Sequence, residues 1–278
     1  MPRPIDLHMH TNLSDGLLSP PELLDRVRKS KLSAFSVTDH DTLAGWRIIA
    51  GLLTESDPEL ITGVELSVRI GDEDLHILAY GFDPDLSALT AALDLYQTRR
   101  SERGREIVNR LQNLGLDITF EHVKETAADG AIGRPHIAEA LFRLGLTKQY
   151  EEAFYKYIGN GGPAYVPKYR LAPAEAFDLV HASGGVAILA HPAIGDMWRH
   201  IDILVPAGLD GIEAYHYSHA SADIKRAKQV AKQYNLILSG GSDFHGRGSR
   251  EATPGSLAVP PEYLDRIKER AMRYRSVQ

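Results

Sequence analysis

The chain has 278 residues, of which 43% are hydrophobic and 24% are charged, and its formal net charge is −6. These values indicate a folded globular protein and exclude a broadly basic surface for long nucleic acid. There is no cysteine, which excludes disulfides, thiolate metal sites and a cysteine nucleophile. Because no apolar leader or membrane-length apolar stretch is visible, we expect a cytoplasmic protein with no membrane association and no obligate protein partner.

Apolar runs and helical patterns alternate over the first 85 residues. The apolar runs lie at residues 5–9, 32–39, 59–68 and 74–81, and the helical patterns at 19–30 and 42–55. This alternation is typical of βα units and a largely parallel sheet. The first helix carries clear start signals, with Ser19 as N-cap, Pro20 at the first position and Glu22 in the first turn.

Residues 86–168 show helical patterns only, and we interpret them as an inserted helical cap. Alternation then resumes, with apolar runs ending near His191, His216 and His245 and a last helix after Pro261. The two β-rich parts supply about seven strands. The predicted fold is therefore α/β, a distorted (β/α)7 TIM-like barrel formed by residues 1–85 and 169–278 with the cap subdomain inserted.

Two pairs of side chains with metal-ligand chemistry lie on the first and last predicted strands. His8 and His10 are two residues apart, so both imidazoles point to one face of the strand. Asp243 and His245 have the same spacing. A closed barrel brings its first and last strands together, and barrel active sites lie at the carboxyl ends of strands. We therefore expect the two pairs to meet.

Further candidates end or interrupt other apolar runs: Asp15, His40, Glu65, His76 and His191. A lone histidine in such a place is usually a hydrogen-bonded core residue, but repeated placement at strand ends favours metal binding. Glu65 lies inside an apolar run, where an unpaired carboxylate is costly to bury, so we interpret it as a bridging ligand.

The complete candidate set has six imidazoles and three carboxylates: His8, His10, Asp15, His40, Glu65, His76, His191, Asp243 and His245. Such donors suit Mn²⁺, Zn²⁺ or Fe²⁺ better than Ca²⁺ or Mg²⁺. Because nine ligands are too many for one ion, we expect two or three divalent ions per chain, with Mn²⁺ favoured over Zn²⁺ and Fe²⁺.

Five other titratable residues are kept out of the ligand set. Asp39 and Asp41 flank His40, and we expect one to orient a ligand imidazole and the other to cap the helix that starts near Thr42. The remaining three are histidines on polar-flanked helical segments, which we expect to be solvated: His122, His181 and His200.

Six ordered motifs resemble those of the PHP superfamily, the polymerase and histidinol phosphatase domain. They are DLHMHTNLSDG (6–16), TDHDT (38–42), GVELS (63–67), HILAYG (76–81), LAHP (189–192) and SDFHG (242–246). The resemblance covers residues 4–84 and about 170–250. It implies a distorted seven-stranded barrel and a trinuclear metal site whose ligands correspond to the nine candidates. The insertion and the length are similar to the TrpH-like branch, whose members are nucleoside 3′,5′-bisphosphate phosphatases and 5′ nucleases of short oligonucleotides.

The expected activity is hydrolysis of a nucleotide phosphate monoester. The substrate we expect is a nucleoside 3′,5′-bisphosphate, which loses its 3′-phosphate to give a nucleoside 5′-monophosphate and phosphate. Three divalent ions outweigh the three carboxylates, so the pocket favours an anionic phosphate over a neutral amide. A metal-bridging hydroxide held by the nine ligands would attack phosphorus in line, because metal coordination lowers the pKa of water.

The predicted cap offers a second phosphate site. Arg134 and His136 begin a helix, where a guanidinium, an imidazole and helix N-terminal amides together suit an anion. The alternative is that Arg134 only pairs with a surface carboxylate. We expect further contacts at the rim of the site from Lys168, Glu213, His216 and His219.

Several alternative functions stay open at this point. A 5′–3′ exonuclease of short oligoribonucleotides and a histidinol-phosphate phosphatase would use the same metal chemistry. An amidohydrolase-type barrel that cleaves C–N bonds also begins with two histidines, but the close of the last strand on Asp243 and His245 is not typical of it. A non-catalytic scaffold would be expected to have lost ligands, and all nine are present.

Overall fold

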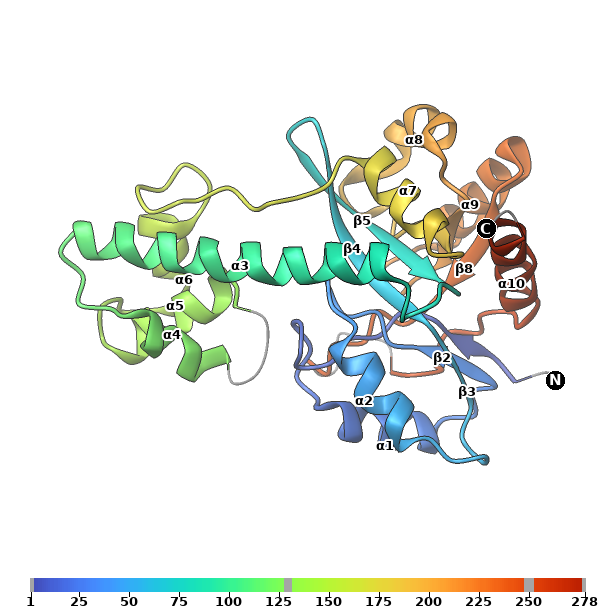
Figure 1. Cartoon of the computed structure of the whole chain (residues 1–278), viewed down its shortest axis with the longest axis horizontal. Coiled ribbons are helices and arrows are strands. Elements are labelled where there is room, and N and C mark those ends of the chain that lie inside the picture. Colours follow the sequence, from blue (N-terminus) through green and yellow to red (C-terminus); the bar gives the residue numbers. More distant parts are fainter. Residues whose placement is uncertain (1–2, 128–131, 248–252, 277–278) are drawn as a thin grey trace. The chain divides into compact units, whose positions relative to one another are not determined.

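The computed structural model describes residues 3–127, 132–247 and 253–276. The chain divides into two compact units, Met1–Leu93 with Arg170–Gln278, and Asp94–Tyr169 (Figure 1). Residues 128–131, which belong to the predicted helical cap, lie outside the described residues. Within the described ranges, none of the helices combines the length and the apolar character needed to cross a membrane.

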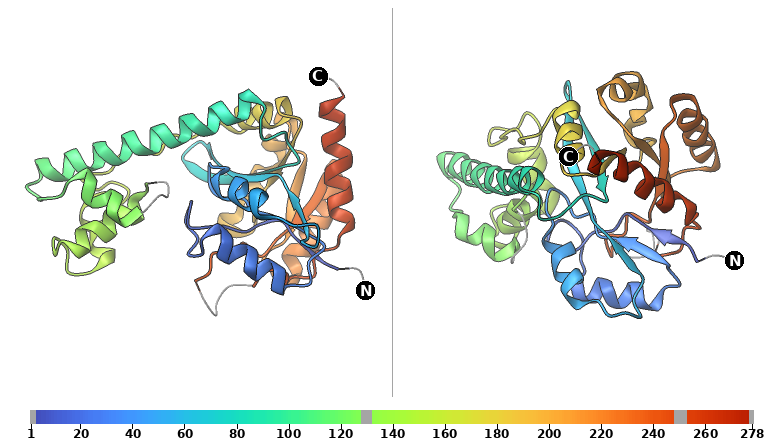
Figure 2. Two further views of the ribbon diagram at one scale, coloured as in Figure 1. Left: turned by 60° about the horizontal axis from the view of Figure 1, so that its bottom comes forward. Right: turned by 45° about the vertical axis from the view of Figure 1, so that its right-hand side comes forward.

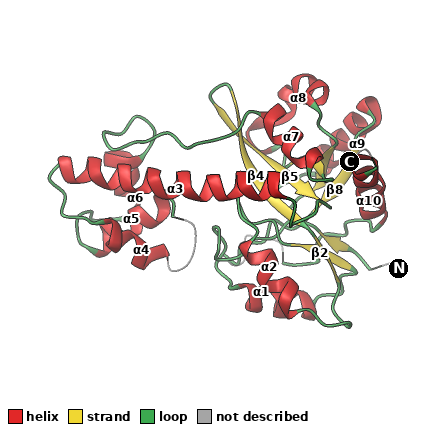
Figure 3. Cartoon of the chain, viewed as in Figure 1, coloured by secondary structure: helices red, strands yellow, loops and turns green. Residues whose placement is uncertain are grey.

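The first unit is built on two sheets, which hold eight strands among the described residues (Figure 3). One sheet is parallel, in the order β1 (Ile5–Asp6), β2 (Ala34–Ser36) and β3 (Glu59–Ile61). The other is mixed, in the order β4 (Gly63–Ile70), β5 (Glu73–Tyr80), β6 (Val186–Leu189), β7 (Gly211–Tyr215) and β8 (Ile237–Gly240). β5 is antiparallel to both of its neighbours, whereas β6, β7 and β8 are parallel.

Two details of the sheets differ from the sequence expectation. The run at residues 59–68 was expected to form one strand, but it forms β3 and β4, which belong to different sheets. The step from β4 to β5 is a hairpin and not a βα unit, because only Gly71 and Asp72 separate the two strands, and a parallel connection needs a dozen or more residues. Gly71 has φ 59°, which suits such a tight turn.

Six helices of the first unit surround these strands, as the two views in Figure 2 show. They are α1 (Pro20–Lys29), α2 (Ala44–Leu52), α7 (Pro173–Ala182), α8 (Ile201–Ala207), α9 (Ser221–Tyr234) and α10 (Glu262–Arg275), with the 3₁₀ segment η2 (Ile194–His200) before α8. The start of α1 is as predicted. The Ser19 backbone N–H donates to the Glu22 carboxylate at 2.8 Å, which satisfies one free amide at the helix end.

Apolar residues of the first strand hold its position. Ile5 and Leu7 pack in one buried cluster with residues of β6 and α10, and Met9 packs in another with α1 and α2. All three side chains are fully buried. His8 and His10, which alternate with these apolar residues, therefore face the other side of the chain segment.

Isolated bridges join the two sheets near the carboxyl ends of the parallel strands. Met9 pairs in parallel with Phe244, and His40 pairs in parallel with Glu65. Close approach of the first pair depends on Gly241, because a Cβ there would lie 2.3 Å from the His8 backbone nitrogen. These bridges bring the chain after β1 next to the chain after β8, and the chain after β2 next to β4.

The second unit is helical within its described residues. It contains most of α3 (Ser87–Asn113), together with α4 (Phe120–Ala127), α5 (Arg134–Arg143), α6 (Tyr150–Ala153) and the π-helical turn η1 (Phe154–Ile158). Its own buried core includes Ile107, Leu111, Val123, Leu141 and Ile158. The boundary of the unit lies within α3, between Leu93 and Asp94.

Candidate metal centre

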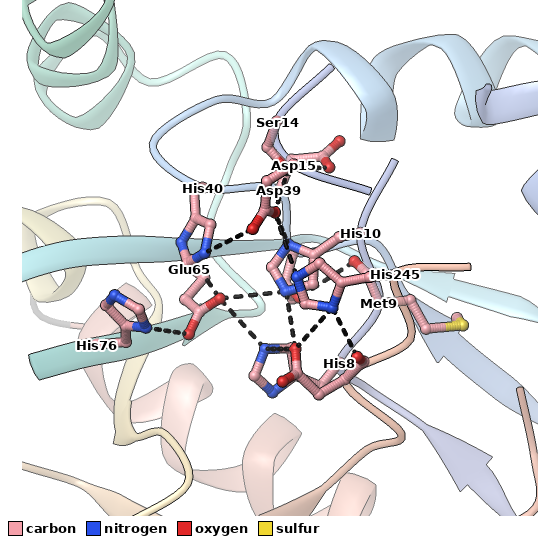
Figure 4. Close-up of polar contacts among 12 residues, drawn as sticks. His8, Met9, His10, Ser14, Asp15, Asp39, His40, Glu65, His76 and His245 are labelled. Atoms are coloured by element: carbon pink, nitrogen blue, oxygen red, sulfur yellow. Dashed lines mark hydrogen bonds and ion pairs between the residues drawn. The ribbon is translucent and has the colours of Figure 1, made fainter. Parts of the chain in front are cut away.

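A buried glutamate lies at the centre of a cluster of histidines in the first unit. Glu65, on β4 (Figure 4), is 1% exposed, and its two carboxylate oxygens lie 2.9 to 3.3 Å from five imidazole nitrogens. These belong to His8, His10, His40, His76 and His191. The position of Glu65 in an apolar run predicted a buried carboxylate with compensating partners, and the imidazoles from separate strands are those partners.

The two pairs expected to meet do so. His8 and His10 follow β1 and point to the same side, while Met9 between them points away from the cluster (Figure 4). Asp243 Oδ1 lies 3.2 Å from His8 Nε2 and 3.1 Å from His10 Nε2. His245 stacks on His10 with 4.3 Å between ring centroids. The parallel bridge between the two chain segments sets this register, so equal spacing in both segments places both pairs on one face.

His76 reaches the cluster by a different route from the other histidines. It lies near the start of β5, which is antiparallel, and the start of an antiparallel strand lies at the edge where the parallel strands end. Its Nδ1 is 2.9 Å from Glu65 Oε1. His191 follows the end of β6, and its Nε2 is 3.1 Å from the same oxygen.

Asp15 forms a second part of the cluster, at the more exposed side. Its oxygens lie 3.3 to 3.9 Å from ring nitrogens of His10, His40 and His245. Groups of potential ligand atoms within metal-binding range of one another overlap here: His10, Asp15, His40 and His245; His8, His10, Glu65 and Asp243; and His40, Glu65 and His76.

Asp39 holds the loop that carries Asp15. Its carboxylate accepts hydrogen bonds from the Thr11 backbone N–H, the Thr11 hydroxyl and the Ser14 hydroxyl, each at 2.7 Å. Orientation of a ligand imidazole was one of the two roles expected for Asp39 and Asp41. These three hydrogen bonds place Asp39 against the loop instead, where it positions the neighbour of Asp15.

Asp41 does not have the capping role expected for one of the two aspartates. Helix α2 begins at Ala44, with Leu43 as its N-cap, two residues beyond Asp41. The Asp41 carboxylate instead accepts from the Ser67 backbone N–H at 2.7 Å and the Ser67 hydroxyl at 2.8 Å, and its φ is 55°. It thereby holds β4 at Ser67, two residues after Glu65.

The donor atoms fit divalent metal ions. Among the described residues, both ring nitrogens of His10 and the Nδ1 atoms of His40 and His191 are buried without a hydrogen-bond partner. Buried polar atoms are nearly always satisfied in folded proteins, so several orphaned ring nitrogens at one place indicate a missing partner. Imidazole and carboxylate donors together suit transition-metal ions.

The charges of the cluster are strongly coupled. Burial lowers the pKa of His8, but the carboxylates of Glu213, Asp243 and Glu65 outweigh it and hold this pKa well above its ordinary value. Burial also lowers the pKa of His10, and the nearby carboxylates of Asp243 and Glu65 overcome this and raise it to about 10. In the metal-free protein, His8 and His10 are therefore protonated beside these carboxylates at neutral pH.

Two residues expected at the rim are buried inside the unit. Glu213 is fully buried, and its carboxylate lies 2.9 Å from His8 Nδ1. His216 is 2% exposed and contacts Asp243. The rim expectation is wrong for both, because Glu213 contacts His8 and His216 contacts Asp243 inside the cluster. Glu213 interrupts an apolar strand, and that signal, already used for Glu65, could have identified it. His219 is half-buried, and its Nδ1 contacts the Ala214 carbonyl at 3.0 Å.

The remaining predicted contacts belong to the second unit. Arg134 begins α5, and its Nη1 donates to Asn160 Oδ1 at 3.1 Å. His136 Nδ1 accepts from the Gly133 backbone N–H at 3.1 Å. Lys168 lies near the end of the same unit.

Two of the three histidines expected to be solvated have carboxylate partners. His181 Nε2 lies 2.7 Å from Asp210, and His200 Nε2 lies 2.6 Å from Glu73. Only the tertiary structure brings these partners close, since each lies far away in the sequence. His122 is also half-buried, and it accepts from the Thr119 backbone N–H at the start of α4.

An α/β unit with a buried carboxylate and imidazole cluster at its strand ends defines a metal-dependent enzyme. The PHP domain family matches residues 6–239, and the chain belongs to this family. It is 34% identical over 250 residues to a 5′-3′ exoribonuclease of Haemophilus influenzae, a match that covers 88% of this chain and 91% of the relative. It is also 34% identical over 255 residues to a 3′,5′-nucleoside bisphosphate phosphatase of Chromobacterium violaceum, with 89% and 90% covered.

A solved structure from Bifidobacterium adolescentis, named as a metal-dependent phosphoesterase, has the same fold. Its TM-score is 0.81 at 28% identity, and the match covers 97% of each chain. The chain is thus a PHP-family metal-dependent phosphoesterase, a hydrolase that acts on phosphoric esters.

Proposed function

We propose that this enzyme removes the 3′-phosphate of nucleoside 3′,5′-bisphosphates and releases nucleoside 5′-monophosphate and phosphate. The observation that carries the proposal is the buried cluster around Glu65 with its orphaned imidazole nitrogens. The relative from Chromobacterium violaceum, which is named a 3′,5′-nucleoside bisphosphate phosphatase, supports the choice of substrate.

The nine candidate ligands would hold two or three divalent ions, and we propose Mn²⁺. When bound, such ions activate water and offset the charge of the phosphate. The carboxylates of Glu65 and Asp243 remain ionised at neutral pH for this purpose. Burial raises the pKa of both Glu65 and Asp243, but the surrounding imidazoles outweigh it and hold both values well below the ordinary range. Neither carboxylate therefore needs to lose a proton before it can bind a cation.

Recognition of a second phosphate is proposed for the start of α5. Arg134 supplies a guanidinium, and His136 supplies an imidazole two residues further on, beside the free amides of the helix N-terminus. Two further substrate contacts are proposed, from Lys168 and His219. A substrate with phosphates at both ends of the ribose would use such a site, whereas a simple monoester would not.

A second candidate activity is 5′-3′ exonuclease action on short oligoribonucleotides. The Haemophilus influenzae relative, which has the same identity to this chain as the phosphatase, is named a 5′-3′ exoribonuclease. The attacked group is again a phosphoric ester, so the same metal centre would serve both reactions.

Phosphate release with added Mn²⁺ tests the proposal directly. The substrates are adenosine 3′,5′-bisphosphate, histidinol phosphate and a short 5′-phosphorylated RNA, with mononucleotide release measured for the RNA. We expect the bisphosphate to react much faster than histidinol phosphate. Faster turnover of the RNA would favour the exonuclease, and fastest turnover of histidinol phosphate would reject both nucleotide activities. Chromogenic amide substrates provide the test for C–N hydrolysis, which we expect to be absent.

Arg134→Ala tests the second phosphate site. Loss of a charge-assisted hydrogen bond is worth about 1.5–3 kcal/mol, so KM for the bisphosphate should rise roughly tenfold to a hundredfold. KM for p-nitrophenyl phosphate should change little. Arg143→Ala is the matched control, because Arg143 lies in the same helix and pairs with Glu139 on the surface. Equal losses of Arg134→Ala on both substrates would remove Arg134 from this role.

A further inference from the structure

Strand β7 supplies none of the nine proposed ligands, yet it buries two polar side chains beside them. Glu213 lies on β7, and His216 follows its end. Both are buried, and β7 is hydrogen-bonded to β6 on one side and β8 on the other. Buried polar groups are retained where they make specific hydrogen bonds, so the partners of these two residues indicate what they do.

Glu213 orients the ring of His8. Its Oε1 lies 2.9 Å from His8 Nδ1. An ionised carboxylate can only accept, so Nδ1 must carry the proton of this bond. The other ring nitrogen, Nε2, then faces Glu65 and Asp243 at 3.2 Å from each. A neutral imidazole held in this way presents a free lone pair to a metal.

The same carboxylate also fixes the backbone of a second proposed ligand. Glu213 Oε2 accepts from the His191 backbone N–H at 2.7 Å. His191 has φ 27°, a conformation that residues with a side chain rarely adopt. Strain of this kind persists only when neighbouring groups hold it. One carboxylate from β7 thus positions ligands that follow β1 and β6.

His216 positions Asp243 by the complementary arrangement. The Ser218 backbone N–H donates to His216 Nδ1 at 3.2 Å, so Nδ1 is the acceptor and Nε2 carries the proton. His216 Nε2 donates to Asp243 Oδ2 at 3.1 Å. This leaves Asp243 Oδ1 directed at His8 and His10. Asp243 also has a positive φ, 50°.

We propose that β7 is the positioning strand of the metal centre: Glu213 fixes His8 and His191, and His216 fixes Asp243, while neither residue binds a metal ion or touches substrate. The inference rests on the metal centre proposed above. It assigns these two residues to the support of ligands that come from three other strands, β1, β6 and β8.

Glu213→Gln tests the first half without a change of shape. The His191 N–H can only donate, so the new amide oxygen must face it, and the amide NH₂ then faces His8 Nδ1. His8 would have to accept that bond and carry its proton on Nε2, toward the ligand cluster. We expect the Kd for Mn²⁺ to rise about 10- to 100-fold, measured by calorimetric titration of the metal-free protein. The visible spectrum of the Co²⁺-loaded protein should change as well.

A pair of variants at His216 tests the second half. His216→Gln retains a side-chain N–H donor for Asp243, whereas His216→Leu removes it. We expect Mn²⁺ affinity close to wild type for His216→Gln and about tenfold weaker for His216→Leu. Equal affinities for the two variants would show that the donor to Asp243 has no positioning role.

Asp210→Asn is the control for general loosening of the fold. Asp210 is buried just before β7 and contacts His181 and Tyr274, neither of which is a proposed metal ligand. This variant should lower Tm and leave Mn²⁺ affinity unchanged. If it weakens Mn²⁺ binding as much as Glu213→Gln does, the positioning role is overturned. Wild-type affinity and an unchanged Co²⁺ spectrum in Glu213→Gln would overturn it too. Failure of the wild-type protein to bind Mn²⁺ would instead reject the metal centre itself.

Discussion

Two buried carboxylates of the first unit, Asp210 and Glu65, have very different surroundings. Asp210 accepts from the His181 ring, the Ala187 backbone N–H, the Arg270 guanidinium and the Tyr274 hydroxyl. Glu65 faces five imidazoles, and several ring nitrogens nearby have no hydrogen-bond partner. Asp210 accepts enough hydrogen bonds from the protein to need no further ligand, so we interpret its cluster as structural. The ring nitrogens without partners around Glu65 are instead free to bind cations.

Removal of metal should have the largest effect, and it should act on the Glu65 cluster and not on the Asp210 cluster. Dialysis against a chelator should abolish phosphatase activity and lower Tm, because metal bound only to the folded state stabilises it by about 4 kcal/mol at a thousand times Kd. Added Mn²⁺ should restore both. Activity that persists when elemental analysis finds no metal would contradict the assignment of the Glu65 cluster.

Glu65→Gln should have the next largest effect. The substitution replaces a charge shared by several imidazoles with a neutral amide, and we expect phosphate release to fall by more than about 100-fold, beyond the loss typical of outer residues. Glu73→Gln is the control, because Glu73 pairs with Arg199 and His200 outside the cluster. A similar loss of activity in Glu65→Gln and Glu73→Gln would show that the Glu65 carboxylate has no special role.

The affinity for Mn²⁺ should rise with pH. The pKa of His10 in the metal-free protein is about 10, although burial opposes this, and its ring must lose that proton to bind metal. Below pH 10, each unit of acidification should therefore weaken binding about tenfold for this proton. By the same linkage, His10 stabilises the metal-free fold fully below its ordinary pKa of 6.5, and this contribution is lost as pH rises through about 10. Calorimetry at several pH values measures the slope, and a flat profile would contradict it.

Tyr274→Phe should have the smallest effect. It removes one donor to Asp210 and should cost about 1 kcal/mol of unfolding free energy, measured by urea denaturation. The rate of phosphate release and the affinity for Mn²⁺ should not change. A fall in either would show that the Asp210 cluster is coupled to the metal centre.

Much of the candidate centre could be predicted because its signals are local. His8 and His10 alternate with buried Ile5, Leu7 and Met9, and a period of two places them on the opposite face whatever the strand pairs with. A charged residue in an apolar run marked Glu65. The start of α1 was readable for the same reason, since Ser19 and Glu22 lie within one turn.

Predictions failed where the partner of a side chain lies far away in the sequence. Glu213 was assigned to the rim, but it touches His8, which is 205 residues distant. His181 and His200 were expected to be solvated, and each meets a carboxylate from another element. Spacing along one strand says which face a side chain takes, but it does not say what occupies that face.

By itself, then, the sequence determined the donor atoms, the faces they take and the PHP family. Only the tertiary structure decided how the strands are paired: an antiparallel β5 that brings His76 to the cluster, and a β7 whose Glu213 contacts His8 and His191. The physical reason is that alternation and burial cost act within a single strand. Strand order, hydrogen-bond direction and the proton carried by each imidazole depend on neighbours that only folding supplies.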